Sequence, residues 1–138
     1  MTQIIKTSTP GKERAKLSKA IVITIREFMR QDKPDENTRD MVAFTILALK
    51  QIAEGIDLSV AAWEKRGYWV KADKYRMEWQ WTGGIAGKIE TALKKEDWGN
   101  ISQHLLVTMG HFSNIKVSDQ HRMGKPWRNA YAEYQKIN

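Results

Sequence analysis

The stretch PGKERAKLSKAIVITIREFMRQ, residues 10–31, has the residue spacing of an amphipathic helix. At about 100° per residue, an arc of roughly 80° holds five basic residues, the basic stripe: Lys12, Lys16, Lys19, Arg26 and Arg30. A similarly narrow arc on the opposite side holds Leu17, Ile21, Ile25 and Phe28. The pattern predicts a helix with one face for a hydrophobic core and one face for a negatively charged partner.

The rest of the chain also follows helical spacing, interrupted by short breaks. Thr9 and Pro10 form a helix start, and Pro34 with Asp35 forms another, because a capping side chain or an N-terminal proline satisfies the first turn. The breaks and apolar spacing predict helices over about 10–31, 35–66, 68–95, 97–112 and 126–136. Gly83 and Gly84 indicate a kink or a close helix contact. No segment alternates as a strand.

The length and composition favour one all-α domain. At 138 residues, with no cysteine, we expect residues 1–138 to form a single-domain bundle of about four to five helices without disulfides. Residues 1–9 are expected to be a flexible N-terminal segment, and residues 113–125 a basic connection. No apolar run resembles a membrane span or a signal peptide, so we expect a cytoplasmic protein.

The net charge of +7 is concentrated at the two ends of the chain. Residues 1–31 hold seven basic and two acidic residues, residues 32–100 hold eleven and twelve, and residues 101–138 hold five and two. Basic ends on a neutral body favour a polyanion partner, most often nucleic acid. A solvated basic face that only keeps the protein in solution is the alternative.

Residues 63–81 interleave aromatic and basic side chains, including Lys74. Bases stack on aromatic rings and phosphates pair with basic groups, so this pattern is also typical of a single-strand binding platform. Tyr68, Tyr75 and Trp79 share a helical stripe with small apolar residues, which favours the core for these three rings. Trp81 projects to another side, where it either packs within the molecule or forms an interface.

Further candidate residues lie within the basic stripe and near the C-terminus. Ile23 is an apolar residue inside the stripe, which suggests a contact with nucleic acid or with another subunit. The connection between the last two predicted helices offers a second group of phosphate-binding candidates: Lys116, Arg122, Lys125 and Arg128. Trp127 is a candidate interface anchor, because tryptophan is enriched at such positions.

The sequence carries no signature of an enzyme, a metal site or a cofactor. Glycine-rich phosphate loops, nucleophile elbows and zinc-protease motifs are absent. His104 and His111 lie seven residues apart, roughly 10 Å along one helix, which is too far for both to bind one metal ion without other ligands. We therefore expect a protein that is not an enzyme and needs no cofactor.

Residues 52–66 partly match a helix-turn-helix motif, with Ser59 able to cap a recognition helix. Asp57 occupies the turn position where glycine is usual, and Trp63 stands where a smaller apolar residue normally packs. One uninterrupted helix from 36 to 66 is the preferred alternative, and such a helix would eliminate a sequence-specific regulator of this kind.

In size, helical character and basic surface without catalytic residues, the chain is similar to the small helical subunits of CRISPR interference complexes. The similarity is one of general character and involves no shared motif. It implies a subunit that binds the backbone of RNA or single-stranded DNA with low sequence specificity, beside other subunits or copies of itself. The alternative is a protein-interaction module that uses exposed aromatic residues.

Overall fold

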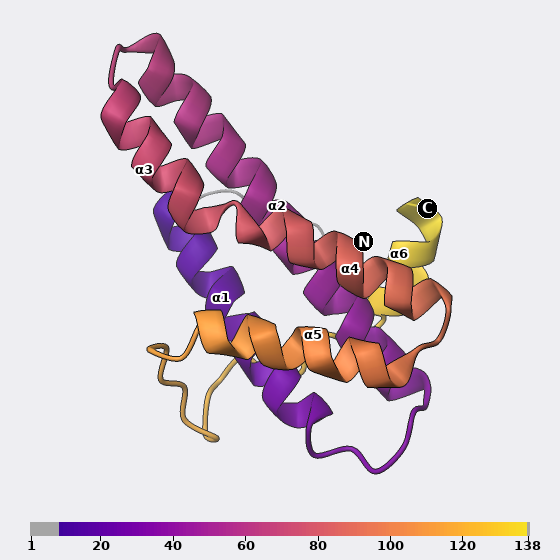
Figure 1. The fold of residues 1–138 in the computed structure, drawn as a ribbon. Coiled ribbons are helices and arrows are strands. Elements are labelled where there is room, and N and C mark those ends of the chain that lie inside the picture. Colours follow the sequence, from indigo (N-terminus) through magenta and orange to yellow (C-terminus); the bar gives the residue numbers. More distant parts are fainter. Residues whose placement is uncertain (1–8, 138) are drawn as a thin grey trace.

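The computed structural model describes residues 9–137, and within this range the chain forms six helices and no strand (Figure 1). The helices are α1 (Pro10–Phe28), α2 (Glu36–Lys65), α3 (Trp69–Trp79), α4 (Trp81–Lys94), α5 (Trp98–His111) and α6 (Ala130–Ile137). The all-α prediction is confirmed. The additional helix arises because the predicted segment 68–95 is two helices. The expected flexible segment 1–9 lies outside the described residues, except for Thr9.

Helix α1 begins where the sequence predicts. The Thr9 hydroxyl accepts a hydrogen bond from the Lys12 amide, and Pro10 occupies the first turn, where a missing amide donor costs nothing. The residues expected on the core side, Leu17, Ile21, Ile25 and Phe28, are all buried. The helix ends at Phe28, three residues earlier than predicted, and Gln31 lies beyond it in the turn toward α2.

Helix α2 is one uninterrupted helix against which α1, α3, α4 and α6 all pack. Its start is a capping box: Asp35 Oδ1 accepts from the Thr38 amide at 2.9 Å, and Thr38 Oγ1 accepts from the Asp35 amide at 2.7 Å. Residues 52–65 continue the same helix through Asp57 without a turn. The helix-turn-helix alternative is therefore eliminated.

The predicted helix over 68–95 bends at Gln80, three residues before the expected glycines. Gln80 ends α3 and precedes α4, and the Thr82 hydroxyl donates to the Trp79 carbonyl oxygen at 2.8 Å across the junction. Gly83 instead marks a close helix contact, because a Cβ atom there would lie 3.6 Å from the Ala53 Cβ of α2. The bend lets α3 and α4 both follow α2 while α4 also contacts α5.

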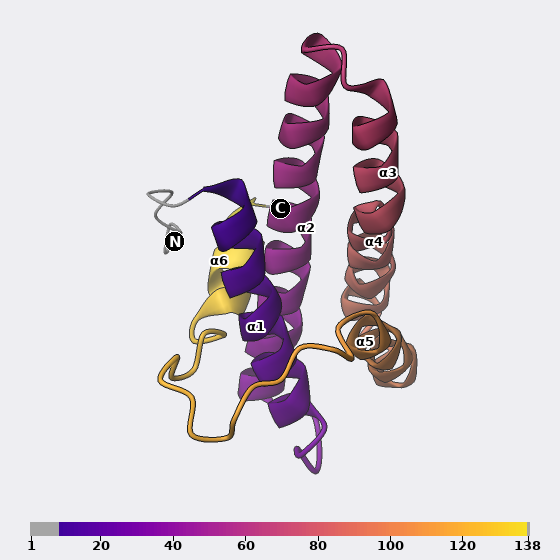
Figure 2. The ribbon, with the colours of Figure 1, turned by 90° about the vertical axis from the view of Figure 1, so that its left-hand side faces the viewer.

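The C-terminal turns of α2 and helix α3 form a hairpin, residues 57–79, that projects from the body; we call it the arm (Figure 1). Gly67 turns the chain between the two helices with a φ of 83°, a left-handed conformation that glycine adopts without a Cβ clash. Figure 2 shows the arm from the side, with α1 beside α2 and α5 at the other end of the molecule.

The last helix begins at Ala130, so the prediction of a start at Pro126 is wrong. Residues 126–129 form a turn, and Asn129 has a φ of 62°, which ends the turn in a conformation that a helix does not continue. Asp40 of α2 then accepts a hydrogen bond from the Tyr131 amide at 2.9 Å. The start of α6 is thus set by a distant side chain. No helix within residues 9–137 is both long and apolar enough to cross a membrane.

Candidate functional site

The structure divides the basic stripe into a free half and a bound half. The side chains of Lys12, Lys16 and Lys19 are exposed and form no hydrogen bond or ion pair with any residue of the range 9–137. We call these three residues the lysine row. Arg26 and Arg30, at the other end of the same helix, are both held by the connection 113–125.

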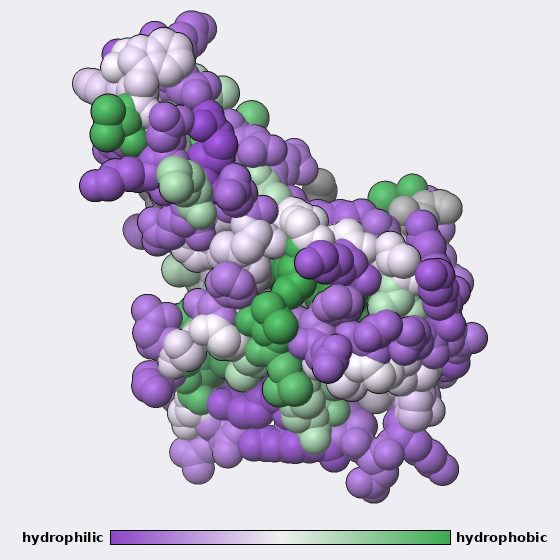
Figure 3. All heavy atoms as spheres, viewed as in Figure 1, coloured by the Kyte–Doolittle hydropathy of each residue, from purple (hydrophilic) through white to green (hydrophobic). Residues whose placement is uncertain are grey.

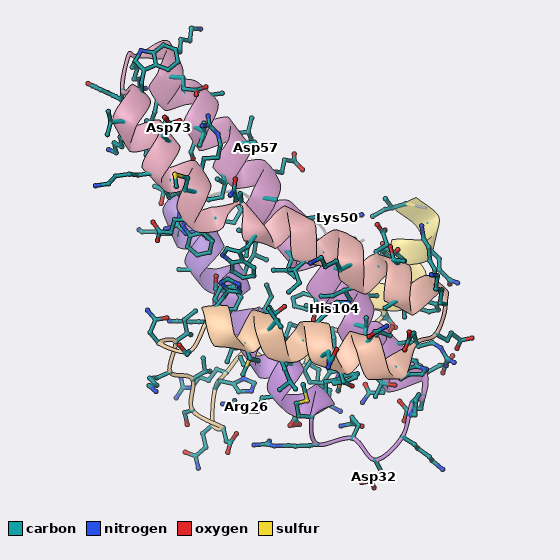
Figure 4. The ribbon with its side chains drawn as sticks, in the orientation of Figure 1. Arg26, Asp32, Lys50, Asp57, Asp73 and His104 are labelled. Carbon is teal, nitrogen blue, oxygen red and sulfur yellow. The ribbon has the colours of Figure 1, made fainter. Side chains whose placement is uncertain are left out.

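The contacts of Arg26 and Arg30 anchor this connection on α1. Arg26 donates to the carbonyl oxygens of Val117 and Ser118 at 2.6 and 3.2 Å, and Arg30 Nη2 lies 3.1 Å from Asp119 Oδ1. Figure 2 shows the connection crossing α1, and Figure 4 shows Arg26 on that side of the helix. The hydrogen bond from Arg30 lowers the pKa of Asp119, and the same bond raises the pKa of Arg30. These two arginines therefore stabilise the contact between α1 and the connection.

Ile23 is buried, with 1% of its surface exposed, so its predicted role as an interface residue is wrong. The connection carries Ile115, Val117 and Met123, which are partly buried and pack against the core. The sequence pattern predicts that all five basic residues of α1 share one exposed face. In the folded chain, a segment about ninety residues away covers that face beyond Lys19.

The docked connection brings one member of the second basic group, Lys116, close to α1. Lys116, Arg122, Lys125 and Arg128 are exposed, and their side chains have no partner within residues 9–137. Lys116 directly precedes Val117, whose carbonyl oxygen binds Arg26. Lys116 is therefore the member of this group that the contacts of the connection place near α1. Lys74, on the arm, is also exposed and unpaired among the described residues, but it lies on a different element.

The arm exposes two aromatic rings, one of which, Tyr68, was predicted to lie in the core. Tyr68 and Trp69 are 55% and 61% exposed, so the core assignment of Tyr68 is wrong, whereas Tyr75 is partly buried as expected. Tyr68 lies in the turn before α3 and is not part of its buried stripe. Trp63 packs against Tyr75 at 4.8 Å between ring centroids, and Lys71 Nζ lies 4.5 Å from the Trp63 ring.

Trp127 and Trp81 both pack within the molecule. Trp127 is 4% exposed and donates from Nε1 to Asn37 Oδ1 at 2.8 Å, so its predicted role as an interface anchor is wrong. Trp81 is partly buried and stacks on His111 at 3.8 Å between ring centroids, with Phe112 against its edge at 5.3 Å. Of the two alternatives for Trp81, the structure shows packing within the molecule. The ring also borders a cleft.

That cleft opens between α1, the α3–α4 junction and the end of α5, and we call it the aromatic cleft. It encloses about 370 Å³, and its lining includes Lys19, Glu78, Trp79, Trp81, His111 and Asn114. Arg14 forms one wall: it donates to the Tyr75 hydroxyl, and its guanidinium carbon lies 5.0 Å from the Trp79 ring centroid. Sequence reasoning missed Arg14, although its spacing to Ile21 and Ile25 places it on the buried side of α1.

Within residues 9–137 no three His, Cys, Asp or Glu side chains come together in a group that could hold a metal ion. His111 stacks on Trp81, whereas His104 borders a separate pocket with Lys88 and Asp97. The arrangement offers charge and aromatic surface for binding. No protein-family model matches the chain, and neither the curated proteins nor the solved structures include a significant match to it.

Proposed function

We propose that the protein binds the phosphate backbone of RNA or single-stranded DNA with little sequence preference, as a helical subunit of a nucleoprotein assembly. The observation that carries this proposal is the lysine row: Lys12, Lys16 and Lys19 are exposed on one helix and have no partner within residues 9–137. Lysines without internal ion pairs are free to replace the counterions of a phosphate backbone.

The dimensions of the row fit several phosphates. Lys12 and Lys19 are seven residues apart, which is about 10.5 Å along an α-helix. Along the axis of a B-form duplex each strand has one phosphate per about 3.4 Å, so the row is as long as the axial rise of about three phosphates. Lys116 adds basic charge close to α1, whereas Arg26 and Arg30 would first have to leave Asp119.

A charge-matched pair of variants tests whether the row is the binding surface. The triple variant Lys12→Glu, Lys16→Glu, Lys19→Glu removes the row, and the triple variant Lys88→Glu, Lys94→Glu, Lys95→Glu makes the same charge change on α4. Binding to short single-stranded RNA and DNA is measured by fluorescence anisotropy across a salt series. The wild-type affinity falls steeply with salt, at a slope of about −0.7 per phosphate contact.

We expect the α1 triple variant to lose most of the affinity and to flatten the salt dependence by about 2 in slope, as for three lost contacts. The α4 triple variant keeps the wild-type slope. Equal losses in both variants would mean that net charge alone attracts the nucleic acid. No binding at low salt would reject the proposed function.

A second candidate function is a protein-interaction module, favoured by the outer face of the arm. Trp69, Val70 and Met77 are 61%, 75% and 72% exposed, and they share one side of α3 at helical spacing. Exposed apolar side chains gathered on a projecting element are typical of subunit contacts. Figure 3 also shows a hydrophobic strip across α5, the helix on which Leu106 and Val107 are exposed.

Light scattering tests this candidate. If the arm joins copies of the chain, the wild type forms a defined oligomer and Trp69→Ser with Val70→Ser returns it to a monomer. The control Leu106→Ser with Val107→Ser leaves the oligomer intact. A wild-type monomer at every concentration would reject self-association through the arm.

A further inference from the structure

We infer that the aromatic cleft holds one unstacked base of a bound single strand while the lysine row holds its phosphates. This inference rests on the proposed function and adds a base-binding site to it. It also predicts that the protein prefers single strands to duplexes, which backbone binding alone does not require. The bases of a duplex are paired and stacked and do not reach a cleft.

The cleft presents a run of nearly parallel rings. Trp79 and Trp81 lie 6.4 Å apart between centroids with an angle of 23° between their planes, and Trp81 and His111 lie 3.8 Å apart at 5°. His111 is exposed at the outer end of this run. A flat base extends such a stack without depending on its identity, since every base has an aromatic face.

The walls of the cleft also carry the polar groups that a nucleotide needs. Lys19 belongs both to the cleft lining and to the lysine row, so a strand held by the row passes the mouth of the cleft. Glu78 and Asn114 also line the cleft, and neither side chain has a hydrogen-bond partner within residues 9–137. A carboxylate accepts from the exocyclic amine of cytosine or adenine, which thymine and uracil lack.

Two fixed contacts keep the cleft open in its present shape. Arg14 ties α1 to α3 through the Tyr75 hydroxyl and the Trp79 ring. Phe112 supports Trp81 from the edge at 5.3 Å, on the side of the ring that joins the core. A base that enters this site meets rings already in place, which limits the ordering cost of binding.

The test uses the full chain and short oligonucleotides that carry one 2-aminopurine, a base whose fluorescence falls when it stacks. The variants are His111→Ala, at the exposed end of the ring stack, and His104→Ala, a matched control on the same helix that borders a different pocket. Glu78→Ala is a third variant, exposed at the surface, that leaves the rings unchanged. Circular dichroism checks that each variant is folded.

We expect the wild type to quench 2-aminopurine in single strands and to prefer oligo-dC or oligo-dA to oligo-dT. His111→Ala should lose the quenching and weaken single-strand binding by about fivefold or more, the loss of one stacked base, without changing duplex binding. His104→Ala should change neither. Glu78→Ala should keep the quenching and lose the preference among the three oligonucleotides.

Salt-dependent binding without quenching, or identical behaviour of the two histidine variants, overturns the inference and leaves backbone binding standing. No binding of any oligonucleotide at low salt overturns both. Competition with cytidine or adenosine monophosphate shows whether the cleft binds a base within a strand or the base of a free nucleotide. A mononucleotide that binds as tightly as the strand would assign the cleft to a free nucleotide and overturn the role in strand binding.

Discussion

At the residue scale, a buried tyrosine links the last helix to the rest of the bundle. The Tyr134 hydroxyl of α6 donates to Glu90 Oε2 of α4 at 2.6 Å, and Lys50 Nζ of α2 lies 3.0 Å from the same oxygen. Burial raises the pKa of Tyr134, and the bond to Glu90 raises it further. For Glu90, burial opposes ionisation, but the bonds from Tyr134 and Lys50 prevail and lower its pKa.

We predict that Tyr134→Phe lowers the free energy of unfolding at pH 7 by about 1.5–3 kcal/mol, as for a hydrogen bond to a charged group. Because the pKa of Glu90 is lower in the folded protein, its ionised contacts stabilise the fold above the ordinary pKa of 4.5. The stabilisation by ionised Glu90 is lost as the pH falls through its folded-state pKa. The difference in free energy of unfolding between the wild type and Tyr134→Phe therefore becomes smaller at low pH. Urea unfolding at pH 7 and pH 3 measures both effects.

Tyr131→Phe is the control for this prediction, because the Tyr131 side chain forms no hydrogen bond within residues 9–137 while its amide binds Asp40. The control should stay within a few tenths of a kcal/mol of the wild type. A Tyr134→Phe variant as stable as this control would contradict the role of the Glu90 contact.

A second residue-scale prediction concerns Asp119, the only carboxylate that the described part of the connection offers to Arg26 and Arg30. Asp119→Asn should loosen the connection and speed trypsin cleavage after Arg122. Since the pKa of Asp119 is lowered in the folded protein, its ion pairs persist above the ordinary pKa of 3.8 and weaken as the pH falls through the folded-state value.

Asp32→Asn is the matched control for trypsin digestion, because Asp32 is exposed in another loop and forms no ion pair with a described residue (Figure 4). It should be cleaved at the wild-type rate. If both variants are cleaved alike, Asp119 does not hold the connection on α1.

At the element scale, two glycines with equal free space should respond oppositely to alanine. A Cβ atom would meet no other atom within 4 Å at either Gly67 or Gly55. Gly67 has a φ of 83°, so Gly67→Ala should cost about 1–2 kcal/mol of stability through backbone strain. Gly55 lies inside α2, where Gly55→Ala should add up to about 1 kcal/mol.

Denaturant unfolding of both variants measures this contrast, and their common wild type is the reference. Each substitution adds one methyl group in free space, so a difference in stability between the two variants reflects the backbone conformation and not packing. Equal effects of the same sign would show that the turn between α2 and α3 does not depend on the left-handed conformation.

The element boundaries that the sequence predicted well are those with local causes. Thr9 with Pro10, Asp35 and Asp97 all cap helices where the sequence placed them, because a cap needs only residues within one turn. The bend at Gln80 carries no local signal of this kind. The start of α6 was missed because Asp40, ninety-one residues away, supplies its hydrogen bond.

At the scale of the whole molecule, the sequence predicted which residues of α1 face the core. On the opposite side of the helix, it predicted correctly only that the three lysines are free of partners within residues 9–137. Apolar spacing is a property of one helix, so it identified Leu17 and Phe28 as core. Whether an outer residue is open depends on the path of distant segments. Ile23 and Trp127 are both buried, and periodicity along one helix did not place either of them, since Trp127, for example, binds Asn37, ninety residues away.

The same distinction applies to the candidate site. The three lysines of the row were predicted to be exposed, and they are. Their sequence pattern did not distinguish them from Arg26 and Arg30, because the difference lies in the ion pairs of both arginines with the distant Asp119 and in the hydrogen bonds of Arg26 to Val117 and Ser118. The aromatic cleft combines residues from α1, the α3–α4 junction and the segment after α5, which no spacing along one helix could bring together.

The arm has a consequence for how the protein opens. Beyond Val60, its buried contribution to the core is small, and its own pairs, such as Arg76 with Glu64 at 2.6 Å, hold its two helices to each other. Local opening there exposes little apolar surface, so its free energy is far below that of global unfolding. Amide protons at the tip of the arm should exchange with solvent deuterium while those in the middle of α2 remain protected.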